Sequence, residues 1–152
     1  MGALRRIGRL SRREAGLLVQ ALGTVLRVRL HLLRHTHDDL RRLIGSYPVP
    51  DAQAEVPRAD LAEIAWSVRS AARLVPGASC LTQASAGQLL LARRGYPSTV
   101  RLSVPARAAA PGKLAPHAWL MAGNTIVLGG TVADYASHRM LHDFTLPLPV
   151  LK

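Results

Sequence analysis

The stretch VPGASCLTQASAGQLLLARRG, residues 75–95, contains the end of one predicted helix and the whole of the next. The Pro-Gly pair near its start ends the first helix, because residues before proline avoid helical angles and glycine readily turns the chain. Ser79 can cap the second helix, which we expect over residues 80–94, with Gly95 as its stop. The only cysteine of the chain, Cys80, therefore stands in the first turn of a helix.

The segments on either side of this stretch differ in their periodicity. Upstream, apolar residues that recur at spacings of three and four predict amphipathic helices over residues 11–43 and 58–75. Downstream, residues 98–104 and 118–128 are rich in branched side chains and turn formers, which indicates strands. A short helix is expected over residues 135–144. Helices followed by an antiparallel sheet of three or four strands define an α+β fold.

The length of 152 residues suits one domain, and 49% apolar but only 4% aromatic residues predict an aliphatic core. Within the chain we distinguish a basic amphipathic helical arm, residues 1–45, from the main domain, residues 58–152. Residues 46–57 contain three prolines and are expected to connect the two.

The net charge of +11 is concentrated in the arm, which holds ten arginines and three acidic residues. Zinc-finger spacing and aromatic residues among the arginines are both missing, so no nucleic-acid binding is predicted. We expect the arm to contact an acidic partner surface or anionic lipid. The apolar run at residues 16–26 is shorter than the ~20 residues that span a bilayer, and a lone cysteine suits the reducing cytoplasm.

Cys80 and His117 are the candidate catalytic pair. A helix N-terminus stabilises a thiolate, although a lone cysteine can also be a small buried apolar residue. His117 begins the predicted strand PHAWL, and alternation places it on the same face as Trp119, where the two rings could simply pack together. As a dyad, His117 would take the thiol proton and later donate it to a leaving amine.

Three motifs resemble a known family: AARLVPGASCLTQA (residues 71–84), LLLARRG (89–95) and HAW (117–119). Together, over residues 58–144, they are similar to the transglutaminase-like leader peptidase of lasso-peptide biosynthesis and to the C-terminal domain of microcin-processing proteins. The resemblance implies that the main domain is transglutaminase-like, with a papain-like cysteine protease core without a cofactor. It also implies that a separate recognition protein presents a ribosomally made precursor peptide, whose leader is removed before an ATP-dependent lasso cyclase closes the ring. The short length implies the stand-alone, split form of the enzyme.

The resemblance also implies an aspartate 12 or 13 residues after His117, to orient the imidazole. Gly129 and Gly130 occupy those positions. The remaining candidates are Asp134, which we place first, the side-chain amide of Asn124, or a backbone carbonyl. A Cys-His pair can work without a charged third member, because a thiol ionises far more readily than a hydroxyl.

The further site predictions concern substrate and metal. Gln83 lies one turn after Cys80, where it could donate to an oxyanion beside the Cys80 amide or merely face solvent. We also place Trp119 in the substrate-binding site. His138 and His142 have metal-ligand spacing on a helix but lack a third ligand, so no metal site is predicted. The predicted function is therefore a leader-removing cysteine endopeptidase; the rival interpretations are a non-catalytic scaffold of the same fold and a membrane-surface protein.

Overall fold

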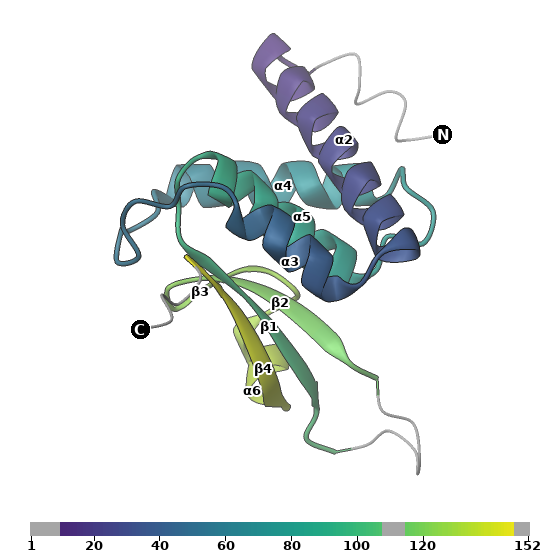
Figure 1. Cartoon of the computed structure of the whole chain (residues 1–152), viewed down its shortest axis with the longest axis vertical. Coiled ribbons are helices and arrows are strands. Elements are labelled where there is room, and N and C mark those ends of the chain that lie inside the picture. The colour runs from purple at the N-terminus through teal and green to yellow at the C-terminus, as the bar shows by residue number, and fades with distance from the viewer. Residues whose placement is uncertain (1–9, 108–114, 148–152) are drawn as a thin grey trace.

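The computed structural model describes residues 10–107 and 115–147 as an α+β fold, which confirms the predicted class (Figure 1). Within these residues, five helices and four strands follow one another. The helices are α2 (Arg12–Arg34), α3 (His37–Gly45), α4 (Arg58–Ala72), α5 (Cys80–Arg93) and α6 (Val132–Ala136). The strands are β1 (Ser98–Pro105), β2 (His117–Ala122), β3 (Thr125–Leu128) and β4 (His138–Leu146).

Helix α5 is the centre of the fold. It contacts β1, β2 and β3 as well as the helices α2, α3 and α4, so it lies between the sheet and the other helices (Figure 1). Close approach to the sheet needs small side chains on α5. A Cβ atom added at Gly87 would lie 2.5 Å from the Leu120 side chain of β2. The sequence of α5 thus determines how closely its first turn, which carries Cys80, is held to the sheet.

The sheet is antiparallel, with the strand order β3-β2-β1-β4. The buried side chain of Gln88 ties α5 to it, because its amide nitrogen donates hydrogen bonds to the carbonyl oxygens of Phe144, at 2.8 Å, and Ser98, at 3.3 Å. A buried amide needs such partners to offset its lost hydration. Strand β3 is one edge of the sheet, and the chain that leaves it reaches the start of α6.

The prediction of a helix over residues 135–144 is wrong. Only α6 is helical here, and residues 138–146 form β4, which pairs with β1 along its whole length. The inter-strand hydrogen bonds and the ion pair between Arg101 and Asp143, 2.6 Å long, outweigh the local sequence preference. On a strand, His138 and His142 are four residues apart, about 13 Å, and so cannot share a metal ion.

Helix α2 belongs to the same core as the rest of the chain. Its inner face buries Ala21, Thr24, Val25 and Val28, and the helix packs against α4 and α5. Over the described residues 10–45, the predicted arm packs through α2 against the rest of the chain. By length and composition alone, α2 could also cross a membrane, but its inner face is occupied by the protein core.

Candidate active site

Cys80 is the first residue of α5, as the sequence predicts. The Ser79 side chain caps the helix by accepting a hydrogen bond from the Thr82 backbone amide, 3.2 Å long. The Gln83 amide donates to the Ser79 carbonyl. Among the described residues no acceptor binds the backbone amide of Cys80 itself. The half-buried thiol thus lies beside a free N–H group at the positive end of a helix.

His117 is the first residue of β2, and its ring is held by a backbone carbonyl. The Nε2 atom lies 2.7 Å from the Gly129 carbonyl oxygen. A carbonyl can only accept, so Nε2 must carry a proton, and in the neutral ring Nδ1 is then the unprotonated nitrogen. The imidazole also packs edge-on against Trp119, with 4.6 Å between ring centroids, which confirms that the two side chains share a face.

Cys80 and His117 line one cavity of about 430 Å³. Gln83 lines it as well, so the structure brings together three of the five predicted site residues. The elements that form the cavity are the end of α4, the start of α5, the start of β2 and the segment from β3 to α6. Its lining residues are Arg69, Cys80, Gln83, His117, Leu128, Gly129, Gly130 and Thr131.

The two glycines after β3 are required by the Trp119 ring. Gly129 has a φ of 124°, and an added Cβ atom would lie 2.6 Å from the indole of Trp119. Gly130, with a φ of 150°, would bring a Cβ atom within 3.3 Å of the same ring. An aspartate at either position would have a strained backbone, and at Gly129 it would also clash with the indole. The close passage of the bare backbone instead places the Gly129 carbonyl against His117.

Asp134 does not orient His117 in this structure, so the predicted hydrogen bond between them is wrong. Its exposed carboxylate caps α6, where it accepts hydrogen bonds from the backbone and hydroxyl of Thr131 at 2.9 and 2.7 Å. The side-chain hydrogen bond from Thr131 is the main reason that the pKa of Asp134 lies below its usual value. Of the three orienting groups left open by the sequence, the backbone carbonyl is the one observed, and Asn124 is exposed in the turn after β2.

Replacing Asp134 by Ala should therefore change kcat/KM for peptide cleavage by less than about threefold, well short of the ~100-fold that loss of an acid-base group costs. Asp134→Asn, which retains an acceptor for the helix cap, is the matched control. If both variants lost ~100-fold, the carboxylate would orient His117 after all. A loss of activity in Asp134→Ala but not in Asp134→Asn would instead result from the lost cap of α6.

Trp119 is a core residue and not part of a substrate-binding surface, which corrects the prediction. It is 1% exposed, and its indole N–H donates to the Ser103 hydroxyl at 2.7 Å. Ser103 in turn lies 2.9 Å from Nδ1 of His138. The buried indole therefore packs against His117 and Gly129, which both line the cavity. Its burial could not be predicted, because the residues that cover it come from β1, α6 and β4.

Of the cavity residues that were not predicted, two have polar side chains, Arg69 and Thr131. Arg69 lies in the last turn of α4 and donates a hydrogen bond to the Val127 carbonyl, 3.2 Å long. In the sequence it is one of several arginines on the polar face of a helix. Only the packing of α4 beside β3 brings it to the cavity, so no local signal could have identified it.

Comparison with known proteins agrees with this arrangement of helices and sheet. The model of the transglutaminase-like superfamily matches residues 4–141, which includes α2 and extends into β4. No curated protein and no solved structure matches the chain. Because the matched region covers most of the sequence, the chain belongs to the transglutaminase-like superfamily.

Proposed function

We propose that this protein is a cysteine endopeptidase that removes the leader from a ribosomally made lasso precursor peptide. The observation that carries the proposal is the shared cavity of Cys80 and His117, with the proton of the neutral imidazole held on Nε2 by Gly129. A base must present an unprotonated nitrogen to the thiol, and Nδ1 is that atom. The choice of a lasso precursor as substrate rests on the resemblance of the motifs around these residues.

The proposed reaction assigns one step to each of these groups. His117 Nδ1 takes the thiol proton, and the Cys80 thiolate forms a bond to the carbonyl carbon of the scissile peptide bond. The electron pair displaced onto oxygen is stabilised by the free Cys80 amide, with Gln83 as a second donor. Collapse breaks the C–N bond, and His117 protonates the leaving amine. Water, deprotonated by His117, then hydrolyses the thioester and releases the new carboxylic acid.

The proposed partners rest on the resemblance of the motifs to the lasso leader peptidases. A separate recognition protein presents the leader, and an ATP-dependent cyclase uses the new N-terminus. We place these steps in the cytoplasm, because the nucleophile is a free thiol and a reducing compartment keeps it reduced.

The test is to incubate the purified protein with a candidate precursor and its recognition protein and to follow the masses. We expect two products, leader and core, whose summed mass exceeds that of the precursor by one water. In parallel, iodoacetamide at pH 6 reports whether Cys80 is ionised and accessible. An intact precursor and an unreactive Cys80 would overturn the proposal in favour of a non-catalytic scaffold.

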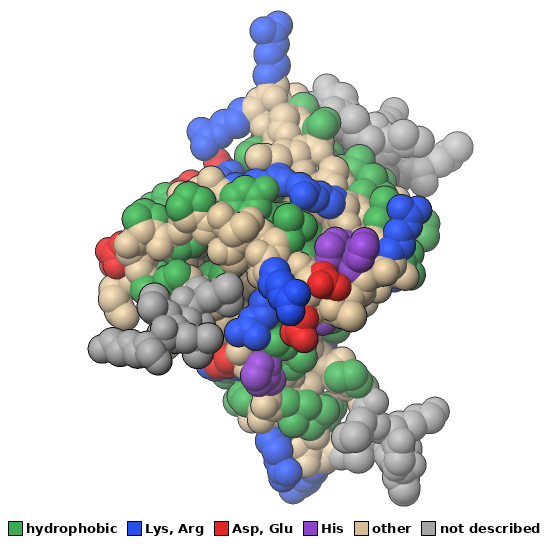
Figure 2. Space-filling view, viewed as in Figure 1, with side chains coloured by type: hydrophobic (Ala, Val, Ile, Leu, Met, Phe, Trp, Pro, Cys, Tyr) green, Lys and Arg blue, Asp and Glu red, His purple; other side chains and the backbone are tan. Residues whose placement is uncertain are grey.

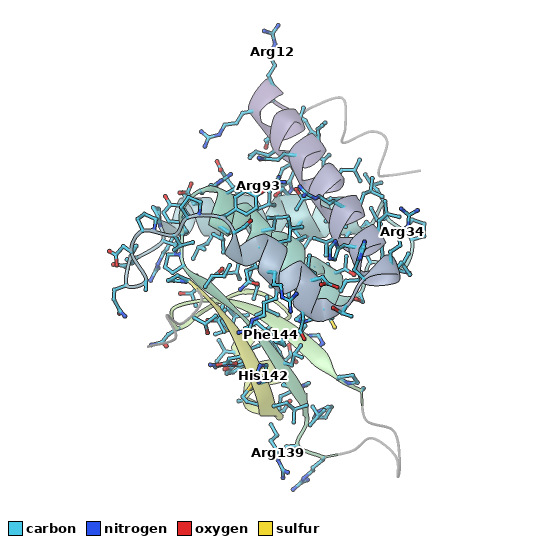
Figure 3. All side chains as sticks on the ribbon, in the orientation of Figure 1. Arg12, Arg34, Arg93, Arg139, His142 and Phe144 are labelled. Atoms are coloured by element: carbon cyan, nitrogen blue, oxygen red, sulfur yellow. The ribbon has the colours of Figure 1, made fainter. Side chains whose placement is uncertain are left out.

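A second function is favoured by the outer face of α2, which we define as Val19, Leu26, Leu30 and Leu33. All four are exposed, Val19 by 70% and Leu33 by 61%, and they lie opposite the buried face of the helix. Figure 2 shows hydrophobic and basic side chains close together over α2, and Figure 3 shows Arg12 and Arg34 at its two ends. We propose that this face lies on an anionic membrane surface, since exposed apolar side chains flanked by arginines suit that interface.

Sedimentation with vesicles tests this surface. The wild-type protein should sediment with vesicles rich in phosphatidylserine and far less with phosphatidylcholine alone, and salt should weaken the binding. Leu30→Glu combined with Leu33→Glu should abolish it, because two charges would enter the apolar layer. Leu141→Glu is the matched control, since Leu141 is 58% exposed on β4, away from α2. Equal sedimentation of the double variant would refute the membrane contact.

A further inference from the structure

Arg69 is the charged residue of the catalytic cavity. It is the one Lys, Arg, Asp or Glu among the described residues that line the cavity with Cys80 and His117. Its Nη2 atom donates to the Val127 carbonyl on the edge strand β3. A guanidinium has five N–H donors, so one hydrogen bond to a carbonyl leaves most of them available. The bond to β3 also restrains the side chain beside the cavity.

Among the described residues, no carboxylate forms an ion pair with the guanidinium of Arg69. All nine Asp and Glu residues of the chain lie in the ranges that the structure describes. The ion pairs formed by these carboxylates are with Arg13, Arg42, Arg94 and Arg101, and none comes within 4.0 Å of Arg69. The two glycines that line the cavity, Gly129 and Gly130, bring no negative charge. An anion that enters the cavity would therefore meet an uncompensated guanidinium.

We propose that Arg69 binds a carboxylate of the substrate, an Asp or Glu side chain close to the scissile bond. The inference rests on the proposed peptidase function for its substrate, but the anion site itself rests on the cavity alone. A planar guanidinium matches the two oxygens of a carboxylate and forms paired hydrogen bonds with them. A carboxylate bound to Arg69 orients the peptide so that the carbonyl of the scissile bond lies beside Cys80, at the start of α5. Arg69 is thus a specificity-determining residue for the side chain next to the cut.

The first test needs no peptide cleavage. Iodoacetate and iodoacetamide both alkylate a thiolate, which displaces iodide and forms an S–C bond, but only iodoacetate carries a carboxylate beside the reacting carbon. We expect the ratio of their rate constants at Cys80, iodoacetate over iodoacetamide, to fall about fivefold or more in Arg69→Gln, roughly the effect of one lost charge-assisted hydrogen bond. Arg69→Lys, which retains the charge, should keep part of the preference.

Arg73→Gln is the matched control. It removes the same charge from the C-terminal end of α4, at an exposed residue that does not line the cavity. The ratio of the iodoacetate to the iodoacetamide rate constant in Arg73→Gln should equal that of the wild type. An unchanged ratio in Arg69→Gln would overturn the inference, and an equal fall in Arg73→Gln would do so too, because the net charge of +11 would then be the cause.

The second test uses paired peptides that carry Glu or Gln next to the scissile bond. The wild-type protein should prefer Glu through a lower KM at similar kcat, and Arg69→Gln should lose that preference. Equal use of both peptides by the wild type would overturn the substrate assignment. If neither peptide nor the precursor is cleaved, the peptidase proposal fails, while the alkylation ratio still decides whether Arg69 forms an anion site.

Discussion

Replacement of Cys80 by Ala should abolish leader removal, with no core product above the uncatalysed background. Cys80 is the only cysteine of the chain, so no other thiol can form the acyl-enzyme. The substitution should leave the fold intact, because the helix cap is made by Ser79 and Thr82 and the thiol is only half-buried. The measurement is the mass-spectrometric cleavage assay, run with the recognition protein present.

Two controls make the result decisive. Cys80→Ser keeps the size of the side chain but replaces the thiol by a hydroxyl that does not ionise at neutral pH, so it should be inactive as well. Ser79→Ala removes the helix cap and should destabilise the protein by about 1 kcal/mol while cleavage persists. Full activity of Cys80→Ala would refute a cysteine protease mechanism, whatever the substrate.

Replacement of His117 by Ala should lower kcat/KM at least ~100-fold, the usual minimum for loss of a general acid-base group. The loss has two sources: no base would take the thiol proton, and no acid would protonate the leaving amine. The alkylation rate of Cys80 near neutral pH should fall with it, because the thiol would have lost the base that takes its proton. Steady-state kinetics and the pH dependence of alkylation measure the two effects separately.

His142→Ala is the matched control for this prediction. His142 lies on β4, where it is exposed and packs against Phe144, and it is not among the residues that line the cavity (Figure 3). Its replacement should change kcat/KM by less than about threefold, as for a surface residue away from the reaction. A loss below about threefold in His117→Ala would show that His117 is not the base.

The contact of His117 with Gly129 provides only one of the two roles of a third catalytic member. In a triad the third residue orients the imidazole and stabilises its charge, as a carboxylate can do. Gly129 can only orient the ring, because its carbonyl is neutral. We therefore expect an enzyme whose imidazolium is less stabilised than in a triad with aspartate, and in which Asp134 contributes mainly through the cap of α6.

Features that depend on near neighbours in the chain could be predicted from the sequence. The Ser79 cap, the placement of Cys80 at the first turn of α5 and the stop at Gly95 follow from local turn and capping chemistry. The order of helices and strands as far as β3 follows from hydrophobic periodicity, and the family motifs are continuous in the chain. Cys80, Gln83 and His117 could be selected for the site on these grounds.

The tertiary structure decided whatever depends on contacts between distant segments. Residues 138–146 form β4 because β1 pairs with them, and Trp119 is buried because β1, β4 and α6 surround it. Arg69 reaches the cavity only because α4 packs beside β3, 58 residues further along the chain. The orienting group of His117 is a backbone carbonyl, which every residue possesses, so no side-chain pattern could identify it; the fold selects Gly129 because the Trp119 ring leaves no room there for a Cβ atom.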